Sequence, residues 1–231
     1  MILYELLGGE SSDIYQELEM ANGLRHYDFL LSAVHISLKV NKAFLSTSVI
    51  KALNFHAITC LHTNAGEFRP CEVTVGQEPN IHFPPAHFRV QALMDDLINT
   101  VNRGWETTET IFLSAYVLWR LNYIHPFING NGRTARAASY FVLCLKSGGL
   151  LPGKTILPEL LRVERTRYVD ALKMADASMQ SGTLDLSALH SLMSELLQRQ
   201  LASVENATTD QPSAPETSAP IEQQKTPVSG N

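Results

Sequence analysis

Apolar residues recur every three or four positions along most of the chain, which is the spacing that gathers them on one face of a helix. Clusters of glycine, proline and serine, which favour helix ends, separate these runs. The pattern predicts helices within residues 17–38, 45–62, 87–104, 106–124, 133–149, 160–178 and 186–204. The run 106–124 is apolar on almost every side, so we expect its helix to be central and buried.

One segment breaks the helical pattern. Polar and apolar residues alternate over Glu72–Gly76, and Gly76, Pro79, Pro84 and Pro85 then interrupt the chain. Alternation with a period of two, followed by turn residues, favours a short β-hairpin over a helix. The predicted fold class is therefore mainly α, a helical bundle with one small β-hairpin.

The composition fits one ordinary globular domain, since 45% of the 231 residues are hydrophobic. The formal net charge of −5 argues against a nucleic-acid partner held by a basic field. Cys60, Cys71 and Cys144 form no CxxC pair, which favours reduced, buried thiols. The chain shows neither a signal-peptide pattern nor the roughly twenty apolar residues of a membrane span. We expect a soluble, cytoplasmic protein with no membrane partner.

The composition changes at about Ser203. From there to Asn231 the chain is rich in Pro, Ser, Thr and Gln and has almost no large apolar residues. We therefore expect a single helical domain at 1–202 and a disordered tail at 203–231. A role of this tail in docking, or in secretion of the protein as an effector, stays open.

The stretch IHPFINGNGRTARA joins two predicted helices and concentrates the candidate chemistry. Pro126 pushes His125 away from helical geometry, and Phe127 is suited to anchor the loop in the core. Gly130 and Gly132 permit close approach of a ligand, and the free N–H groups at the start of the next helix favour an anion.

Arg133 and Arg136 lie three positions apart, on one face of that next helix. The planar guanidinium fork suits phosphate oxygens, and two forks suit a polyphosphate better than a single carboxylate. A base, an anion site and two arginines together indicate a site for nucleotide phosphates, where His125 would accept a proton from a nucleophile.

The stretch HPFINGNGRTAR closely resembles the signature HPFx(D/E)GNGRxxR of the Fic (filamentation induced by cAMP) family, and departs from it only at Asn129. GEFR at 66–69, VTVGQEPNIHFPP at 73–85 and RYVDALKMAD at 167–176 are also similar to family elements, so the likeness covers residues 45–177. The resemblance implies the Fic fold and a protein adenylyltransferase (AMPylator). Such an enzyme transfers AMP from ATP, with Mg²⁺ or Mn²⁺, to a Ser, Thr or Tyr hydroxyl of a target protein.

The resemblance also implies a role for each matching residue. His125 would be the general base for the target hydroxyl. The implied phosphate-binding residues are Gly130, Asn131, Gly132, Arg133 and Arg136. The flap hairpin that docks the target segment would contain Val75, Gly76, Ile81, His82 and Phe83. Because the related Doc kinases carry lysine in place of the second glycine, Gly132 favours nucleotide transfer over phosphate transfer.

Asn129 stands where the family has an acidic Mg²⁺ ligand. Its amide oxygen can still bind Mg²⁺ but brings no negative charge, and Mg²⁺ takes most of its ligands in such sites from phosphates and water. We therefore expect a weaker metal requirement and a slower transfer. The alternatives are a Fic-fold protein that binds a nucleotide or partner with little or no catalysis, and an enzyme that transfers a different nucleotide.

Many Fic proteins carry an inhibitory helix, (S/T)xxxE(G/N), whose glutamate pairs with the arginine equivalent to Arg136. In this chain no such glutamate is followed by Gly or Asn. Ser191 and Glu195 are the candidates for a C-terminal inhibitory contact, and a solvated helix face explains them as well. The sequence thus predicts a separate antitoxin or inhibitor protein, or no intrinsic inhibition, and leaves the oligomeric state open.

Overall fold

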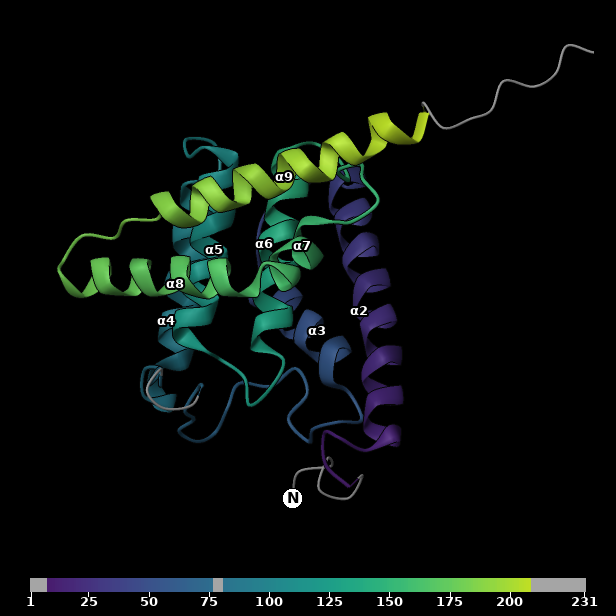
Figure 1. Cartoon of the computed structure of the whole chain (residues 1–231). Helices are drawn as coiled ribbons and strands as arrows, with labels where there is room; N and C mark the ends of the chain where they lie inside the picture. The colour runs from purple at the N-terminus through teal and green to yellow at the C-terminus, as the bar shows by residue number, and fades with distance from the viewer. Residues whose placement is uncertain (1–7, 77–80, 209–231) are drawn as a thin grey trace, which may run out of the picture.

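The computed structural model describes residues 8–76 and 81–208 of the chain, which form a bundle of helices (Figure 1). The helices are α2 (Asp13–Lys39), α3 (Thr47–Ile58), the short 3-10 helix η1 (His87–Arg89), α4 (Val90–Arg103), α5 (Thr110–Ile124), α6 (Asn131–Lys146), α7 (Leu157–Val163), α8 (Arg165–Gln180) and α9 (Ser187–Thr208). The prediction of a mainly helical fold is confirmed. Within the described part of the chain, no helix is long and apolar enough to cross a membrane.

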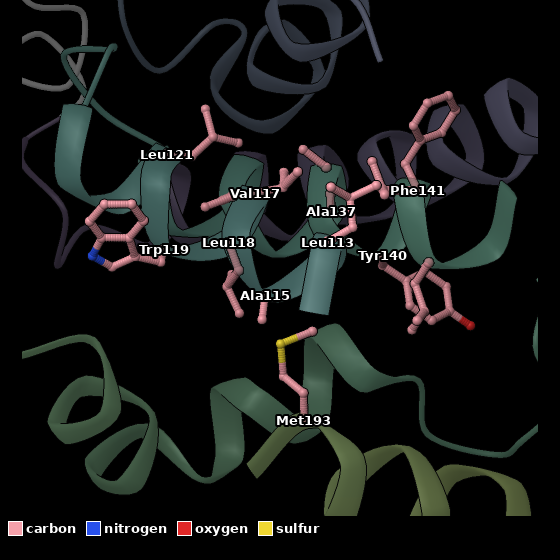
Figure 2. Close-up of a cluster of buried hydrophobic side chains, with 14 of the residues drawn as sticks. Leu113, Ala115, Val117, Leu118, Trp119, Leu121, Ala137, Tyr140, Phe141 and Met193 are labelled. Atoms are coloured by element: carbon pink, nitrogen blue, oxygen red, sulfur yellow. The ribbon is translucent and has the colours of Figure 1, made fainter. Parts of the chain in front are cut away.

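Helices α5 and α6 form the centre of the bundle, as the apolar run at 106–124 predicts. They pack along each other, with α2 and α3 against α6 and with α4, α8 and α9 against α5. Figure 2 shows Met193 of α9 pointing toward Ala115 of α5 within this core. The Ser114 and Ser139 hydroxyls each donate to the other residue's backbone carbonyl, at 2.8 and 2.9 Å, which ties the two central helices together. The loop between these helices is therefore held at both ends by the most buried part of the molecule.

Two helix boundaries differ from the prediction. The single helix expected within 160–178 is two helices, because the backbone leaves the helical region at Glu164 (φ −82°, ψ 35°). There the Glu164 carboxylate accepts a hydrogen bond from Arg199 of α9, at 2.8 Å.

Helix α9 continues to Thr208, so residues 203–208, which we assigned to the disordered tail, are helical. The Ser203 hydroxyl accepts a hydrogen bond from the Lys154 backbone N–H at 2.9 Å, so the helix still packs on the domain beyond the predicted boundary. The rest of the predicted tail, 209–231, lies outside the described residues.

The predicted β-hairpin is reduced to a single antiparallel bridge. The Val75 N–H donates to the His82 carbonyl at 3.0 Å, and the His82 N–H donates to the Val75 carbonyl at 2.9 Å. No strand is formed within the described ranges, and residues 77–80 lie outside them. Pro84 and Pro85, which follow the bridge, have no N–H group to extend a ladder of hydrogen bonds.

Candidate functional site

The loop between α5 and α6 begins with a strained residue. His125 caps the C-terminus of α5 in the left-handed region (φ 50°, ψ 60°), which costs a residue with a side chain about 1–2 kcal/mol. The next residue, Pro126, cannot continue a helix, in agreement with the expectation that His125 leaves helical geometry. Phe127 is fully buried against Phe68 and anchors the loop, as predicted.

The side chain of Asn131 closes the loop on itself. Its amide oxygen accepts from the Phe127 N–H at 2.9 Å, and its amide nitrogen donates to the Phe127 carbonyl at 2.8 Å. At Gly130 (φ 75°), a Cβ atom would lie only 2.6 Å from Ile58 Cγ2, so this position requires glycine. The Asn131 side chain therefore shapes the loop, which leaves its backbone N–H as the group that could face a phosphate.

The N-terminus of α6 is open to an anion. No side chain caps the helix, and among the described residues the backbone N–H groups of residues 131–133 have no backbone acceptor. The Arg136 guanidinium lies over this helix start, since a Cβ atom on Gly132 would be 3.3 Å from Arg136 Nη1. Free N–H groups, the positive end of a helix dipole and a guanidinium thus coincide.

The two predicted phosphate-binding arginines are in different environments. Arg133 donates to the Ala57 carbonyl at 3.0 Å and pairs with Glu19 of α2 at 3.2 Å. Arg136 makes no hydrogen bond or ion pair with any described residue, and burial lowers its pKa. Arg136 is therefore the guanidinium available to a ligand, whereas Arg133 already links α6 to α2 and α3.

His125 is a neutral base in this structure. Burial lowers the pKa of His125 to about 4, and the neighbouring His82 and Arg69 act in the same direction. A hydrogen bond with the Asn122 backbone opposes them without reversing the shift. At neutral pH the imidazole is therefore unprotonated and able to accept a proton.

Arg69 of the GEFR segment holds the loop that carries His125. It is 2% exposed, its Nε donates to the His125 carbonyl at 2.9 Å, and its backbone N–H donates to the Pro126 carbonyl at 2.8 Å. The same guanidinium donates to the carbonyls of Cys71 and Pro85, on either side of the Val75–His82 bridge. One buried side chain therefore connects the flap to the loop that carries His125.

Part of the predicted flap faces the same cavity as His125. Val75, Gly76 and His82 line a cavity of about 580 Å³ together with His125, whereas Ile81 and Phe83 do not. Phe83 is 72% exposed, so it is left on the outer surface, where an apolar side chain can meet another protein.

The opposite wall of this cavity was not predicted. It is formed by Trp119 and Asn122 of α5 and by Tyr168 and Asp176 of α8. The Trp119 indole donates to Asp176 at 2.8 Å, and Asn122 donates to the Tyr168 hydroxyl at 2.8 Å. Burial raises the pKa of Tyr168 to about 12, so it is a neutral hydrogen-bonding group. The sequence signals this wall only weakly, because Asn122 is a polar residue in the apolar helix α5, whereas Tyr168 and Asp176 belong to a mostly polar helix.

Asn54 of α3 is a second residue that the sequence analysis missed. It is fully buried, and its amide nitrogen donates to the Asn129 carbonyl at 2.9 Å and to the Thr134 hydroxyl at 3.2 Å. Its amide oxygen accepts from the Gly66 N–H at 3.0 Å. Asn54 therefore joins α3, the loop, α6 and the GEFR segment through one side chain.

Asn129 presents a neutral amide oxygen where the resemblance implies a metal ligand. Its side-chain oxygen accepts from the Gly130 N–H at 2.5 Å and faces Arg133 Nη2 at 3.5 Å. In the described ranges, no group of three or more His, Cys, Asp and Glu side chains could hold a metal ion. The protein thus offers one neutral oxygen here, which fits a metal ion held mainly by a ligand's phosphates and by water.

Glu195, the candidate inhibitory residue, does not lie beside Arg136. Its carboxylate receives two hydrogen bonds from Arg167 of α8, at 2.6 and 3.0 Å, on the exposed surface. These contacts support the other interpretation given above, in which Glu195 lies on a solvated helix face.

The chain matches the model of a known family. Residues 44–143 match the model of the Fic/DOC family. Among curated proteins, the chain is 28% identical over 165 residues to a protein adenylyltransferase Fic of Drosophila persimilis, covering 70% of this chain and 30% of the relative. A protein of the same name from Drosophila erecta is 33% identical over 112 residues, covering 48% of this chain and 20% of the relative. The chain thus spans less than a third of the length of these relatives.

Solved structures share the fold. A Fic domain containing signaling protein from Bacteroides thetaiotaomicron matches with a TM-score of 0.69 at 21% identity, over 90% of this chain and 80% of that protein. The BepC protein from Bartonella tribocorum, with bound AMPPNP, matches with a TM-score of 0.54 at 12% identity, over 78% of this chain and 86% of that protein. The predicted Fic fold is confirmed.

Proposed function

This chain belongs to the Fic/DOC family, and we propose that it is a protein adenylyltransferase that transfers AMP from ATP to a Ser, Thr or Tyr hydroxyl of a target protein. Its curated relatives carry that name, and a structural neighbour was solved with AMPPNP. The observation that carries the proposal is the shared cavity, in which an unprotonated His125 lies beside the open N-terminus of α6 and the unpaired Arg136.

In the proposed reaction, the α-phosphate sits at the start of α6, where the Asn131 and Gly132 N–H groups and Arg136 bind its oxygens. His125 takes the proton from the target hydroxyl as the hydroxyl oxygen attacks the α-phosphorus, and the bond from that phosphorus to the bridging oxygen of the leaving pyrophosphate breaks. The donors at α6 are fixed before the reaction, so they need no reorganisation as charge develops. Val75 and Gly76 border the cavity, where they would hold the target segment.

We propose that the metal ion is bound mainly by the phosphates of ATP and that Asn129 is its protein ligand. Bound Mg²⁺ or Mn²⁺ would neutralise phosphate charge. The amide brings no charge of its own, so the proposal includes a slow transfer with a weak metal requirement.

A second candidate function is nucleotide binding without transfer. It is favoured by the same Asn129, whose oxygen is already hydrogen-bonded to the Gly130 N–H. The nucleotide base is a separate question, because the wall residues Trp119 and Tyr168 are almost fully buried and present little surface that could select one base.

A labelling experiment separates these functions. The full chain is incubated with α-³²P-ATP, Mg²⁺ or Mn²⁺ and a cell lysate, beside His125→Ala and the control His35→Ala, which alters an exposed histidine on α2. Label on protein that persists in the control and disappears in His125→Ala supports AMP transfer. If no label appears with ATP, CTP, GTP or UTP while nucleotide still binds, the binding function replaces the transferase.

A further inference from the structure

A second cavity lies on the other side of Arg136. It has a volume of about 570 Å³ and is lined by residues of α2, the first half of α6 and the segment 153–162. Arg136 lines both cavities, whereas Arg133 lines only this one and His125 lines only the first. Because Arg136 lines both cavities, we infer that a phosphate chain with one end beside His125 would extend along this side chain toward Arg133 and the second cavity.

The second cavity is positively charged. Its lining contains Arg133, Arg136, Lys154 and Arg162 against one acidic residue, Glu159. Glu159 is itself bound to Arg162, through hydrogen bonds of 2.9 Å to Nε. The exposed Lys154 ammonium has no acidic partner among the described residues, so an anionic ligand would meet it directly.

The cavity also offers surface for an organic group. Tyr27, Leu30 and Ile156 form an apolar wall, and the buried Nε2 of His26 has no hydrogen-bond partner in the described part of the chain. Its volume falls in the range of about 300–1,000 Å³ that is typical of sites for organic ligands. A bare diphosphate would leave the apolar wall and the His26 nitrogen without contacts.

From this arrangement we propose that the second cavity binds the leaving-group half of the donor, and that it accepts an organic polyphosphate larger than pyrophosphate. The inference rests on the proposed function and extends its donor class from ATP to adenosine polyphosphates that carry a second organic group. The acceptor oxygen forms a bond to the α-phosphorus and the hydroxyl proton passes to His125. The bond from that phosphorus to the bridging oxygen breaks, and the leaving polyphosphate keeps the electron pair, so AMP is transferred without any redox change.

The test compares two donors by isothermal titration calorimetry on the full chain with Mg²⁺. Diadenosine tetraphosphate, whose leaving group is ATP, is the extended donor, and ATP is the reference. We expect diadenosine tetraphosphate to bind about tenfold more tightly, since it adds charge-assisted and apolar contacts in the second cavity. Tyr27→Ala should remove most of this advantage. Lys154→Ala should weaken the extended donor about tenfold and ATP, whose leaving group is only pyrophosphate, much less. Lys42→Ala, at an exposed lysine outside both cavities, is the control.

Two outcomes overturn the inference. The first is that ATP binds and diadenosine tetraphosphate binds no more tightly, or that Lys154→Ala weakens both donors equally. In that case the second cavity does not hold an organic leaving group, and the proposed transferase is unaffected. If ATP itself does not bind, the proposed function fails and the donor inference fails with it.

Discussion

Replacing Arg69 with alanine would test how the loop that carries His125 is held. The Arg69 side chain is completely buried and donates to three carbonyls, of His125, Cys71 and Pro85. These acceptors belong to the loop and to the two ends of the flap, and the farthest of them, His125, is 56 residues from Arg69 in the sequence. The substitution would therefore leave several acceptors without a donor and remove the link between flap and loop.

The contacts give an approximate magnitude. A hydrogen bond from a charged donor contributes about 1.5–3 kcal/mol, and a buried acceptor left without a partner costs about 1–3 kcal/mol. Cys60 and Cys71 are exposed, which corrects the expectation of buried thiols, so water can replace the lost donor at Cys71. We therefore expect Arg69→Ala to lower the free energy of unfolding by about 3–5 kcal/mol, a large part of the roughly 5–15 kcal/mol of a typical domain. Arg69→Lys keeps the charge but not the planar fork and should cause about half of that loss.

Urea unfolding followed by circular dichroism measures this difference directly. With a slope of about 2 kcal/mol per molar urea, the midpoint of Arg69→Ala should fall by roughly 1.5–2.5 M. Arg103→Ala, at an exposed position in the last turn of α4, should change stability by less than about 0.5 kcal/mol. An unchanged midpoint in Arg69→Ala would show that other contacts hold the loop, and our account of Arg69 would be wrong.

Three further outcomes are expected. Asn129→Asp should raise Mg²⁺-dependent transfer about tenfold or more by adding a charged ligand, and equal rates at every Mg²⁺ concentration would contradict the role given to this residue. Burial holds the pKa of both His26 and His125 at about 4, below the ordinary 6.5, so protonation favours the unfolded chain. Their stabilising contribution is complete above pH 6.5 and falls as the pH drops toward 4, by about 3–4 kcal/mol in total between pH 7 and 5. Urea titrations at both pH values should show this loss, reduced by about half in His26→Asn. Glu195→Gly should leave transfer activity unchanged, because the Glu195 carboxylate binds Arg167, and a large rise in labelling would reinstate an inhibitory role.

The features that the sequence predicts correctly depend on neighbouring residues. The position of the α5–α6 loop, the departure of His125 from helical geometry and the buried anchor Phe127 all follow from a few consecutive side chains. The helix boundaries are less predictable where a distant contact decides them. The helix breaks at Glu164, whose carboxylate binds Arg199, 35 residues away. The helical pattern of apolar residues continues through Glu164, so the sequence does not show this break.

The contacts that fix the geometry of the site depend on backbone atoms, which no pattern of side chains reveals. Asn54 is visible in the sequence as a lone polar residue in an apolar run, yet its partners include the carbonyl of Asn129, 75 residues later, and the N–H of Gly66. Because every residue except proline presents the same two groups, a buried amide can find a partner wherever the fold brings a free one. Asn54→Leu would keep the apolar pattern while leaving the Gly66 N–H without its acceptor. The requirement for asparagine here thus comes from the assembled fold, which brings α3, the loop and α6 together at this one side chain.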